Sequence, residues 1–96
     1  MQDLFLCKHT ITVGDYLKLA YVLISTEIGA EKDVLEHLKT IPEVMEAYIV
    51  YGVYDIVVKI AVEEIDQLRD IITSRIRRFG KVRSTLTMIV VEGFSK

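Results

Sequence analysis

Hydrophobic and polar positions follow two different periods along the chain. Residues 19–26 are a short run of aromatic and branched residues that ends before Gly29, which is typical of a strand. Residues 30–40 instead place their apolar side chains on one stripe at helical spacing and their charged side chains on the other side. The stripe consists of Val34, Leu35, Leu38 and Ile41. Pro42 disfavours helical geometry at the residue before it, so the predicted helix ends there.

The middle of the chain alternates with a period of two. Residues 44–51 and 55–62 both place apolar side chains at every second position, as strands do. Gly52 lies in the short interval between them. That interval cannot hold a crossover, so the two predicted strands form an antiparallel hairpin.

The clearest signal is a helix over residues 63–78. Its apolar residues recur at spacings of three, four, four and three: Ile65, Leu68, Ile72, Ile76 and Phe79. Acidic residues gather at its start and arginines at its end, as the helix dipole favours, and Gly80 suits the C-terminal cap. Residues 82–91 then alternate again and predict a last strand.

The predicted order β-α-β-β-α-β indicates an α+β protein with the ferredoxin-like fold. This fold is a four-stranded antiparallel sheet with two helices on one face and the first strand of each half at the centre. The other face is uncovered, and pairing two such faces would give a dimer of the α+β barrel type. We expect this face to carry these residues or their alternates: Tyr48, Val50, Val57, Ala61, Thr85 and Thr87.

Length and composition indicate one domain that associates with other copies. The chain has 96 residues, of which 51% are hydrophobic, and this fraction exceeds the usual content of a soluble domain. We predict a short N-terminal extension over 1–18, with at most one short strand around Ile11 and Val13, and a domain over 19–92. The apolar excess favours a buried interface.

Charge and cysteine content exclude several classes. The formal net charge is −2, so direct binding of nucleic acid is not expected. No apolar run reaches the length of a membrane span. The single cysteine, Cys7, excludes an internal disulfide and a CxxC metal site, and a free thiol suits the cytoplasm.

The residue types that carry catalysis are sparse, and we expect no catalytic residue, no metal and no cofactor. His9 lies in the N-terminal extension, and His37 lies among charged residues, which indicates a solvated surface histidine. A basic run from Arg75 to Arg83 surrounds Phe79. Two readings apply to it: a nucleic-acid patch, or cations that stabilise a helix end, which we favour.

The hairpin segment 50–55 is the best candidate for a ligand site. A glycine turn exposes backbone N–H and C=O groups, and the nearby Asp55 carboxylate can pair with an ammonium group. A free amino acid needs both kinds of partner. The alternative is that Asp55 only accepts backbone N–H bonds and tightens the turn, and spacing alone favours this alternative.

Several stretches resemble a known family. Residues 44–48 (VMEAY), 50–55 (VYGVYD), 56–59 (IVVK) and 80–87 (GKVRSTLT) are similar to the effector domain, or RAM domain, of the Lrp/AsnC feast/famine transcription regulators. The resemblance extends over about 19–91. Its most specific features are the glycine–two residues–aspartate hairpin and the late threonine–one residue–threonine pair.

This resemblance implies a ferredoxin-like domain that dimerises through its sheet and assembles into rings, octameric or decameric, with amino acids bound between dimers. By position it assigns ligand contacts to Gly52, Tyr54, Asp55, Thr85 and Thr87. The family usually has a small hydroxyl residue before the glycine, whereas this chain has Tyr51, which would reshape the pocket.

We therefore expect a stand-alone effector domain without the helix-turn-helix module of the full-length regulators. It would bind an amino acid or a similar small metabolite and modulate transcription through a DNA-binding Lrp/AsnC-type paralogue. Two alternatives remain at this point. One is a cofactor-free dimeric α+β barrel enzyme, a monooxygenase or isomerase, and the other is a purely structural assembly piece.

Overall fold

The structure, a computed structural model, describes residues 17–96. Cys7, His9 and the predicted strand around Ile11 and Val13 lie outside this range. The elements follow the predicted order, and their bounds agree with the predicted ones to within a few residues. They are β2 (Lys18–Thr26), α1 (Glu31–Leu38), β3 (Val44–Ile49), β4 (Ile56–Val62), α2 (Ile65–Ile71), the π-helical turn η2 (Ile72–Ile76) and β5 (Val82–Ile89).

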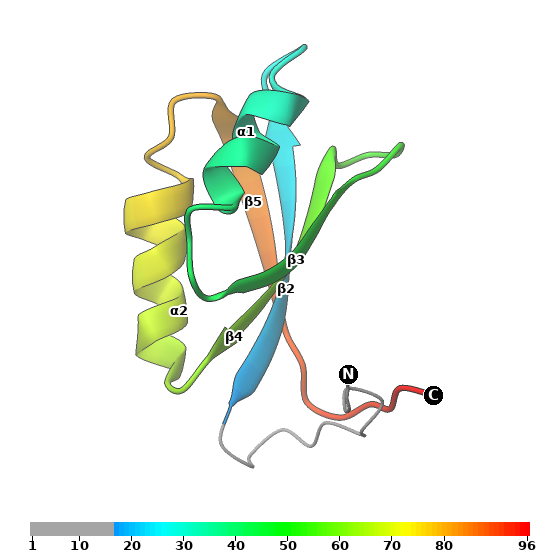
Figure 1. The fold of residues 1–96 in the computed structure, drawn as a ribbon, viewed down its shortest axis with the longest axis vertical. Helices are drawn as coiled ribbons and strands as arrows, with labels where there is room; N and C mark the ends of the chain where they lie inside the picture. Colours follow the sequence, from blue (N-terminus) through cyan, green and yellow to red (C-terminus); the bar gives the residue numbers. More distant parts are fainter. Residues whose placement is uncertain (1–16) are drawn as a thin grey trace.

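The four described strands form one antiparallel sheet in the order β3-β4-β2-β5. As predicted, the first strands of the two halves, β2 and β4, occupy the centre. Both helices lie on one face of the sheet, and the opposite face carries no helix (Figure 1). The ferredoxin-like α+β fold is therefore confirmed.

The hydrophobic core lies between the sheet and the helices. Every second residue of the two central strands points into it, because side chains alternate between the faces of a strand. The core residues of β2 and β4 are Ala20, Val22, Ile24, Ile56, Val58, Ile60 and Val62. Val34 and Leu38 of α1 and Leu68 and Ile71 of α2 pack against them, as the helical stripes predicted.

The uncovered face of the sheet is rich in apolar groups, and on β5 it carries the alternates of the residues that the prediction named first. Tyr48, Val57 and Ala61 belong to this face, since they share the register of Tyr21 and Leu23. Thr85 and Thr87 do not: they pair with Ile24 and Val22 and therefore face the helices. Leu86 and Met88, their alternates, lie on the uncovered face beside Leu23 and Tyr21, and both are about half exposed (each 45%).

The second helix is not α-helical throughout. It changes at Ile72 into a π-helical turn, closed by the Arg77 N–H, which donates to the Ile72 carbonyl (2.8 Å). In an α-helix four residues exceed one turn by about 40°, so two successive spacings of four would carry Ile76 away from the sheet. The wider turn reduces this drift, and Ile76 is buried. Within residues 17–96, no helix is long and apolar enough to span a membrane.

Candidate functional site

The predicted hairpin joins β3 to β4, and Asp55 lies at the end of its turn, directly before the first residue of β4. The backbone N–H of Val50 donates to the Asp55 carbonyl (2.8 Å), and the Asp55 N–H donates to the Ile24 carbonyl of β2 (2.9 Å). Within residues 17–96, the Asp55 carboxylate accepts no hydrogen bond from the hairpin turn itself. Its Oδ2 accepts the backbone N–H of Thr26 (2.8 Å) and lies 3.4 Å from the Thr26 hydroxyl oxygen. Asp55 therefore joins the hairpin to the end of β2.

A hollow of about 390 Å³ lies between the hairpin and the start of α1. Its lining residues are Glu31, Lys32, Ile49, Val50, Tyr51, Gly52 and Asp55. The Tyr51 side chain is fully exposed, whereas Tyr54 is half-buried. Lys32 brings a cation and Asp55 an anion to this hollow, which are the two charges that a zwitterionic amino acid requires.

Gly52 is not required by the hairpin itself. A Cβ atom added there would meet no atom within 4 Å, and its φ is not in the left-handed region. Gly29, in the turn before α1, is different, because its φ of +82° is one that side chains rarely adopt. The space beside Gly52 is consistent with close approach of another molecule to the backbone.

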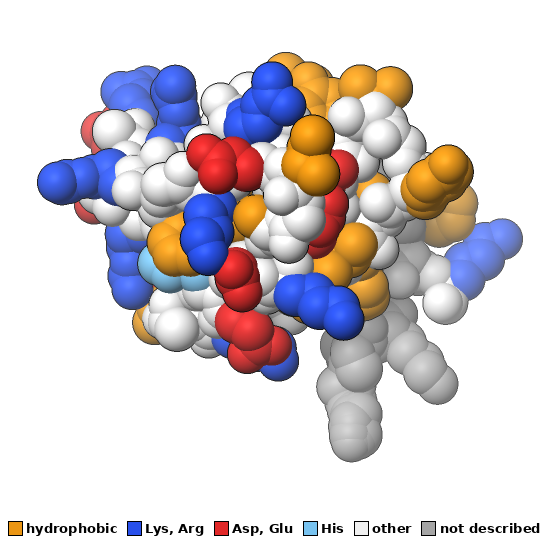
Figure 2. Space-filling model, turned by 90° about the horizontal axis from the view of Figure 1, so that it is seen from above, with side chains coloured by type: hydrophobic (Ala, Val, Ile, Leu, Met, Phe, Trp, Pro, Cys, Tyr) orange, Lys and Arg blue, Asp and Glu red, His pale blue; other side chains and the backbone are white. Residues whose placement is uncertain are grey.

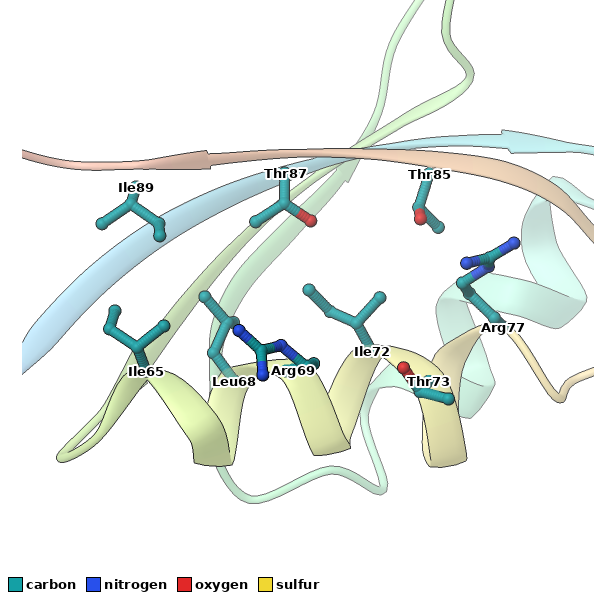
Figure 3. A pocket seen from close by; sticks show the side chains of 9 residues that line it. All are labelled: Ile65, Leu68, Arg69, Ile72, Thr73, Arg77, Thr85, Thr87 and Ile89. Carbon is teal, nitrogen blue, oxygen red and sulfur yellow. The ribbon is translucent and has the colours of Figure 1, made fainter.

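Thr85 and Thr87 line a second hollow, of about 310 Å³, beneath the second helix (Figure 3). Their side chains point from β5 toward α2 and η2. The other lining residues are Ile65, Leu68, Arg69, Ile72, Thr73, Arg77 and Ile89. Sequence reasoning assigned no role to Arg69, although its spacing of four from Ile65 places it on the margin of the buried stripe. It considered Arg77 only as part of the basic run at the helix end.

Four of the five predicted site residues therefore divide between two hollows of a single chain, and Tyr54 lines neither of these two hollows. Both hollows are on the helix side of the sheet. The hairpin hollow is near the Ile24 end of β2, and the second hollow extends along β5 from Thr85, opposite Ile24, to Ile89, opposite Ala20. Ile24 pairs with Ile56 of β4 on one side and with Thr85 of β5 on the other, so one strand separates the hairpin base from the threonines. The structure places the two groups as neighbours across β2 but does not unite them in one cavity.

His37 has more partners than a solvated histidine would have. Its ring stacks on Phe79, with centroids 4.2 Å apart and planes at 6°, and its Nε2 donates to the Arg75 carbonyl (2.7 Å). His37 thus fastens α1 to the end of the second helix and is half-buried. The two residues of the stack are 42 positions apart, so no local pattern could have revealed this contact.

One polar cluster interrupts the uncovered apolar face. The Tyr48 hydroxyl donates to Glu46 Oε1 (3.0 Å), and Lys59 Nζ lies 3.6 Å from Glu46 Oε2. The hydrogen bond to Glu46, followed by the charge of that carboxylate, raises the pKa of the Tyr48 phenol above its ordinary value. Among the described residues, no group of three His, Cys, Asp or Glu side chains is arranged to hold a metal ion.

Comparison with known proteins places these features in a family. The family model of the Lrp/AsnC ligand binding domain matches residues 19–96. The HTH-type transcriptional regulator FL11 of Pyrococcus horikoshii is 36% identical over 80 residues, which is 80% of this chain and 50% of that protein. The chain thus spans about half the length of the curated relatives it matches.

Solved structures of similar fold include members of the same kind of regulator. The crystal structure of FFRP-DM1 is 40% identical, with a TM-score of 0.75, and the match covers 77% of this chain and 99% of that one. A transcriptional regulator from Neisseria meningitidis, solved as its L-Met complex, has a TM-score of 0.76 over 82% of this chain and 53% of its own. At 14% identity, that likeness shows the shared fold alone.

Proposed function

The chain belongs to the Lrp/AsnC ligand binding domain family, and on that premise we propose that it binds a small molecule, an amino acid, and assembles with other copies of itself. Residues 19–92 would form the binding and oligomerisation unit, and 1–18 an extension. We propose no catalytic step. The relatives at this level of identity are described as transcriptional regulators.

One observation carries the ligand proposal: Ile24 lies between Ile56 and Thr85 in the sheet, so that each copy presents Asp55 on one side of β2 and Thr85, followed by Thr87, on the other. Asp55 Oδ2 is engaged by Thr26, while Oδ1 accepts no hydrogen bond from residues 17–96. An acceptor oxygen on one side and two hydroxyl groups on the other match the ammonium and carboxylate of an amino acid. Gly52 and Tyr54 would border this ligand from the hairpin.

Because one chain keeps these groups in two hollows, we infer that a second copy completes the site. The hairpin of one copy would supply Gly52, Tyr54 and Asp55, and β5 of a neighbour would supply Thr85 and Thr87. Tyr51 and Val53 support this arrangement, since both are almost fully exposed beside Gly52 (107% and 93%). Apolar side chains exposed to this extent at a loop tip favour burial against a partner.

The uncovered face of the sheet supplies a second contact. Leu86, Met88, Tyr21 and Tyr48 are exposed there, and Leu23 and Val57 lie between them. A contiguous apolar surface of this kind marks an interface. In Figure 2 hydrophobic side chains gather mainly on the side that carries the hairpin in Figure 1, and charged ones on the helix side. Face-to-face dimers joined through their hairpins would form a ring of eight or ten chains.

In the cell, the assembly would act in the cytoplasm on transcription through a partner that carries a DNA-binding domain, such as an Lrp/AsnC-type paralogue. No direct contact with nucleic acid and no cofactor are required. The role of this chain would be to couple occupancy of the amino-acid site to assembly with that partner.

A thermal-shift screen of the twenty amino acids tests the ligand proposal. A ligand present at one hundred times its Kd stabilises the folded state by about 2.7 kcal/mol, which is a readily measured rise in Tm. We expect one amino acid or a small group of them to raise the Tm. A flat response to all twenty, with the protein folded and oligomeric, would remove the ligand proposal and leave an assembly function.

A further inference from the structure

The hollow between the second helix and β5 is lined by arginines, whose positive charge does not match the ammonium group of an amino acid. Arg69 of α2 and Arg77, just after η2, both line it, and Arg77 points toward Thr85 (Figure 3). Arg77 forms no ion pair within residues 17–96. Arg69 has one exposed partner, Asp66, at 3.6 Å, an arrangement that contributes little free energy.

The rest of the lining is hydroxyl and apolar. Thr85 and Thr87 present hydroxyl groups from the strand side, and Ile65, Leu68 and Ile89 supply an aliphatic floor. Among residues 17–96, no aspartate or glutamate lines this hollow. Beside Arg77, a ligand ammonium group would therefore meet a guanidinium group and no carboxylate, whereas a ligand carboxylate would meet a cation and the Thr85 hydroxyl donor.

We propose that this hollow binds an aliphatic carboxylate that lacks an ammonium group. The carboxylate would lie between Arg77 and the Thr85 hydroxyl, and the aliphatic chain would pack on Ile72 and extend toward Leu68. A volume of about 310 Å³ suits a ligand with only a few carbon atoms. The inference rests on the proposed function only in that Thr85 and Thr87 serve both ligands, which would therefore compete.

The experiment compares three probes of one skeleton: 4-methylpentanoate, 4-methylpentanamide and L-leucine. Binding is followed on the full chain by NMR of isoleucine methyl groups, which remains practicable in a large assembly. We expect the carboxylate to shift the methyl resonances of Ile72, which lies beside Arg77 and Thr85, and to bind about fivefold more tightly there than the uncharged amide or leucine.

Two arginine variants localise the effect. Arg77→Gln removes one cation of the hollow and should weaken binding of 4-methylpentanoate by about fivefold. Arg75→Gln makes the same charge change two residues away, outside this hollow, and should leave the affinity unchanged. Both residues are exposed, so neither change should affect folding.

The outcomes separate this inference from the amino-acid proposal. Equal binding of the amide and the carboxylate, or an Arg77→Gln variant with unchanged affinity, overturns the carboxylate site. If Arg77→Gln leaves the affinity for 4-methylpentanoate unchanged while amino-acid binding still depends on Asp55, the carboxylate site is overturned and the proposed function stands. Carboxylate binding that depends on Arg77, in a chain that binds no amino acid, would support this inference and contradict the proposed function.

Discussion

The Asp55 carboxylate accepts a hydrogen bond from the backbone N–H of Thr26, with 2.8 Å between the Thr26 nitrogen and Asp55 Oδ2. The bond joins the end of β2 to the base of the β3–β4 hairpin across 29 residues of sequence. Thr26 is buried, and it is the only buried polar residue in the described part of the chain. A buried N–H without a partner is costly, so this carboxylate has a structural role whatever else it binds.

Removing that carboxylate should destabilise the fold. We expect Asp55→Ala to lower the free energy of unfolding by about 1–3 kcal/mol, because the Thr26 N–H loses a charged acceptor. Asp55→Asn retains an acceptor oxygen, so its free energy of unfolding should fall by less than that of Asp55→Ala. Urea denaturation of the three proteins measures the difference, and equal midpoints for Asp55→Ala and the wild type would contradict a bracing role.

Self-association through the uncovered face should fail when one of its apolar residues becomes charged. Leu86→Glu places a carboxylate on that face, beside Leu23 of the central strand β2, and should shift the chain toward smaller species in light scattering. Ile28→Glu is the matched control, because Ile28 is 98% exposed in the turn before α1, away from this face. If both variants keep the wild-type mass, the association surface lies elsewhere.

The phenol of Tyr48 should titrate above 10.0, the ordinary tyrosine value, because Glu46 accepts its hydrogen bond and opposes a second negative charge. A raised pKa means that the hydrogen bond stabilises the folded state at pH values below about 10, and that this contribution is lost as the pH rises through the folded-state pKa. NMR titration of tyrosine ring carbons gives the value. Glu46→Gln should lower it toward 10, and no change in this variant would refute the assignment.

Two glycine variants should differ in stability. Gly29→Ala forces a side chain into a backbone conformation with φ of +82° and should cost about 1 kcal/mol. Gly52→Ala meets no such strain and no atom within 4 Å, so the fold should retain its stability. Thermal unfolding compares the two. If Gly52→Ala leaves the fold intact but abolishes amino-acid binding, then Gly52 provides room for a ligand or a neighbouring chain.

The sequence predicted the fold almost completely because the signals are local. Alternation along residues 44–51 and 55–62 and the stripe from Ile65 to Phe79 specify which faces are buried, and the order of the elements leaves one sheet topology. The face of Thr85 and Thr87 was left open by the sequence, which assigned either these residues or their alternates to the uncovered face. Both possible faces of β5 contain apolar groups, and the register that selects between them depends on the pairing with β2.

The contacts that define the candidate site were less accessible from sequence. Asp55 was identified as a polar group at the hairpin, but its partner Thr26 lies on another strand and has no local signature. The π-helical turn at Ile72 also went unpredicted, since a spacing of four suits an α-helix nearly as well. Contacts between side chains that are distant in sequence can be identified only from coordinates, whereas periodicity can be read from the sequence.

The central claim is that two copies share each amino-acid site, and a mixing experiment tests it most directly. Asp55→Ala damages the hairpin half of the site and Thr87→Val damages the strand half, so each variant alone should fail to bind the amino acid that stabilises the wild type. When the two variants are refolded together, hybrid assemblies should recover roughly a quarter of the wild-type sites, because one contact in four then joins an intact hairpin to an intact strand. Calorimetric titration counts those sites. A mixture that binds no ligand, although hybrids form, would show that each chain holds its own site and would contradict the shared-site account.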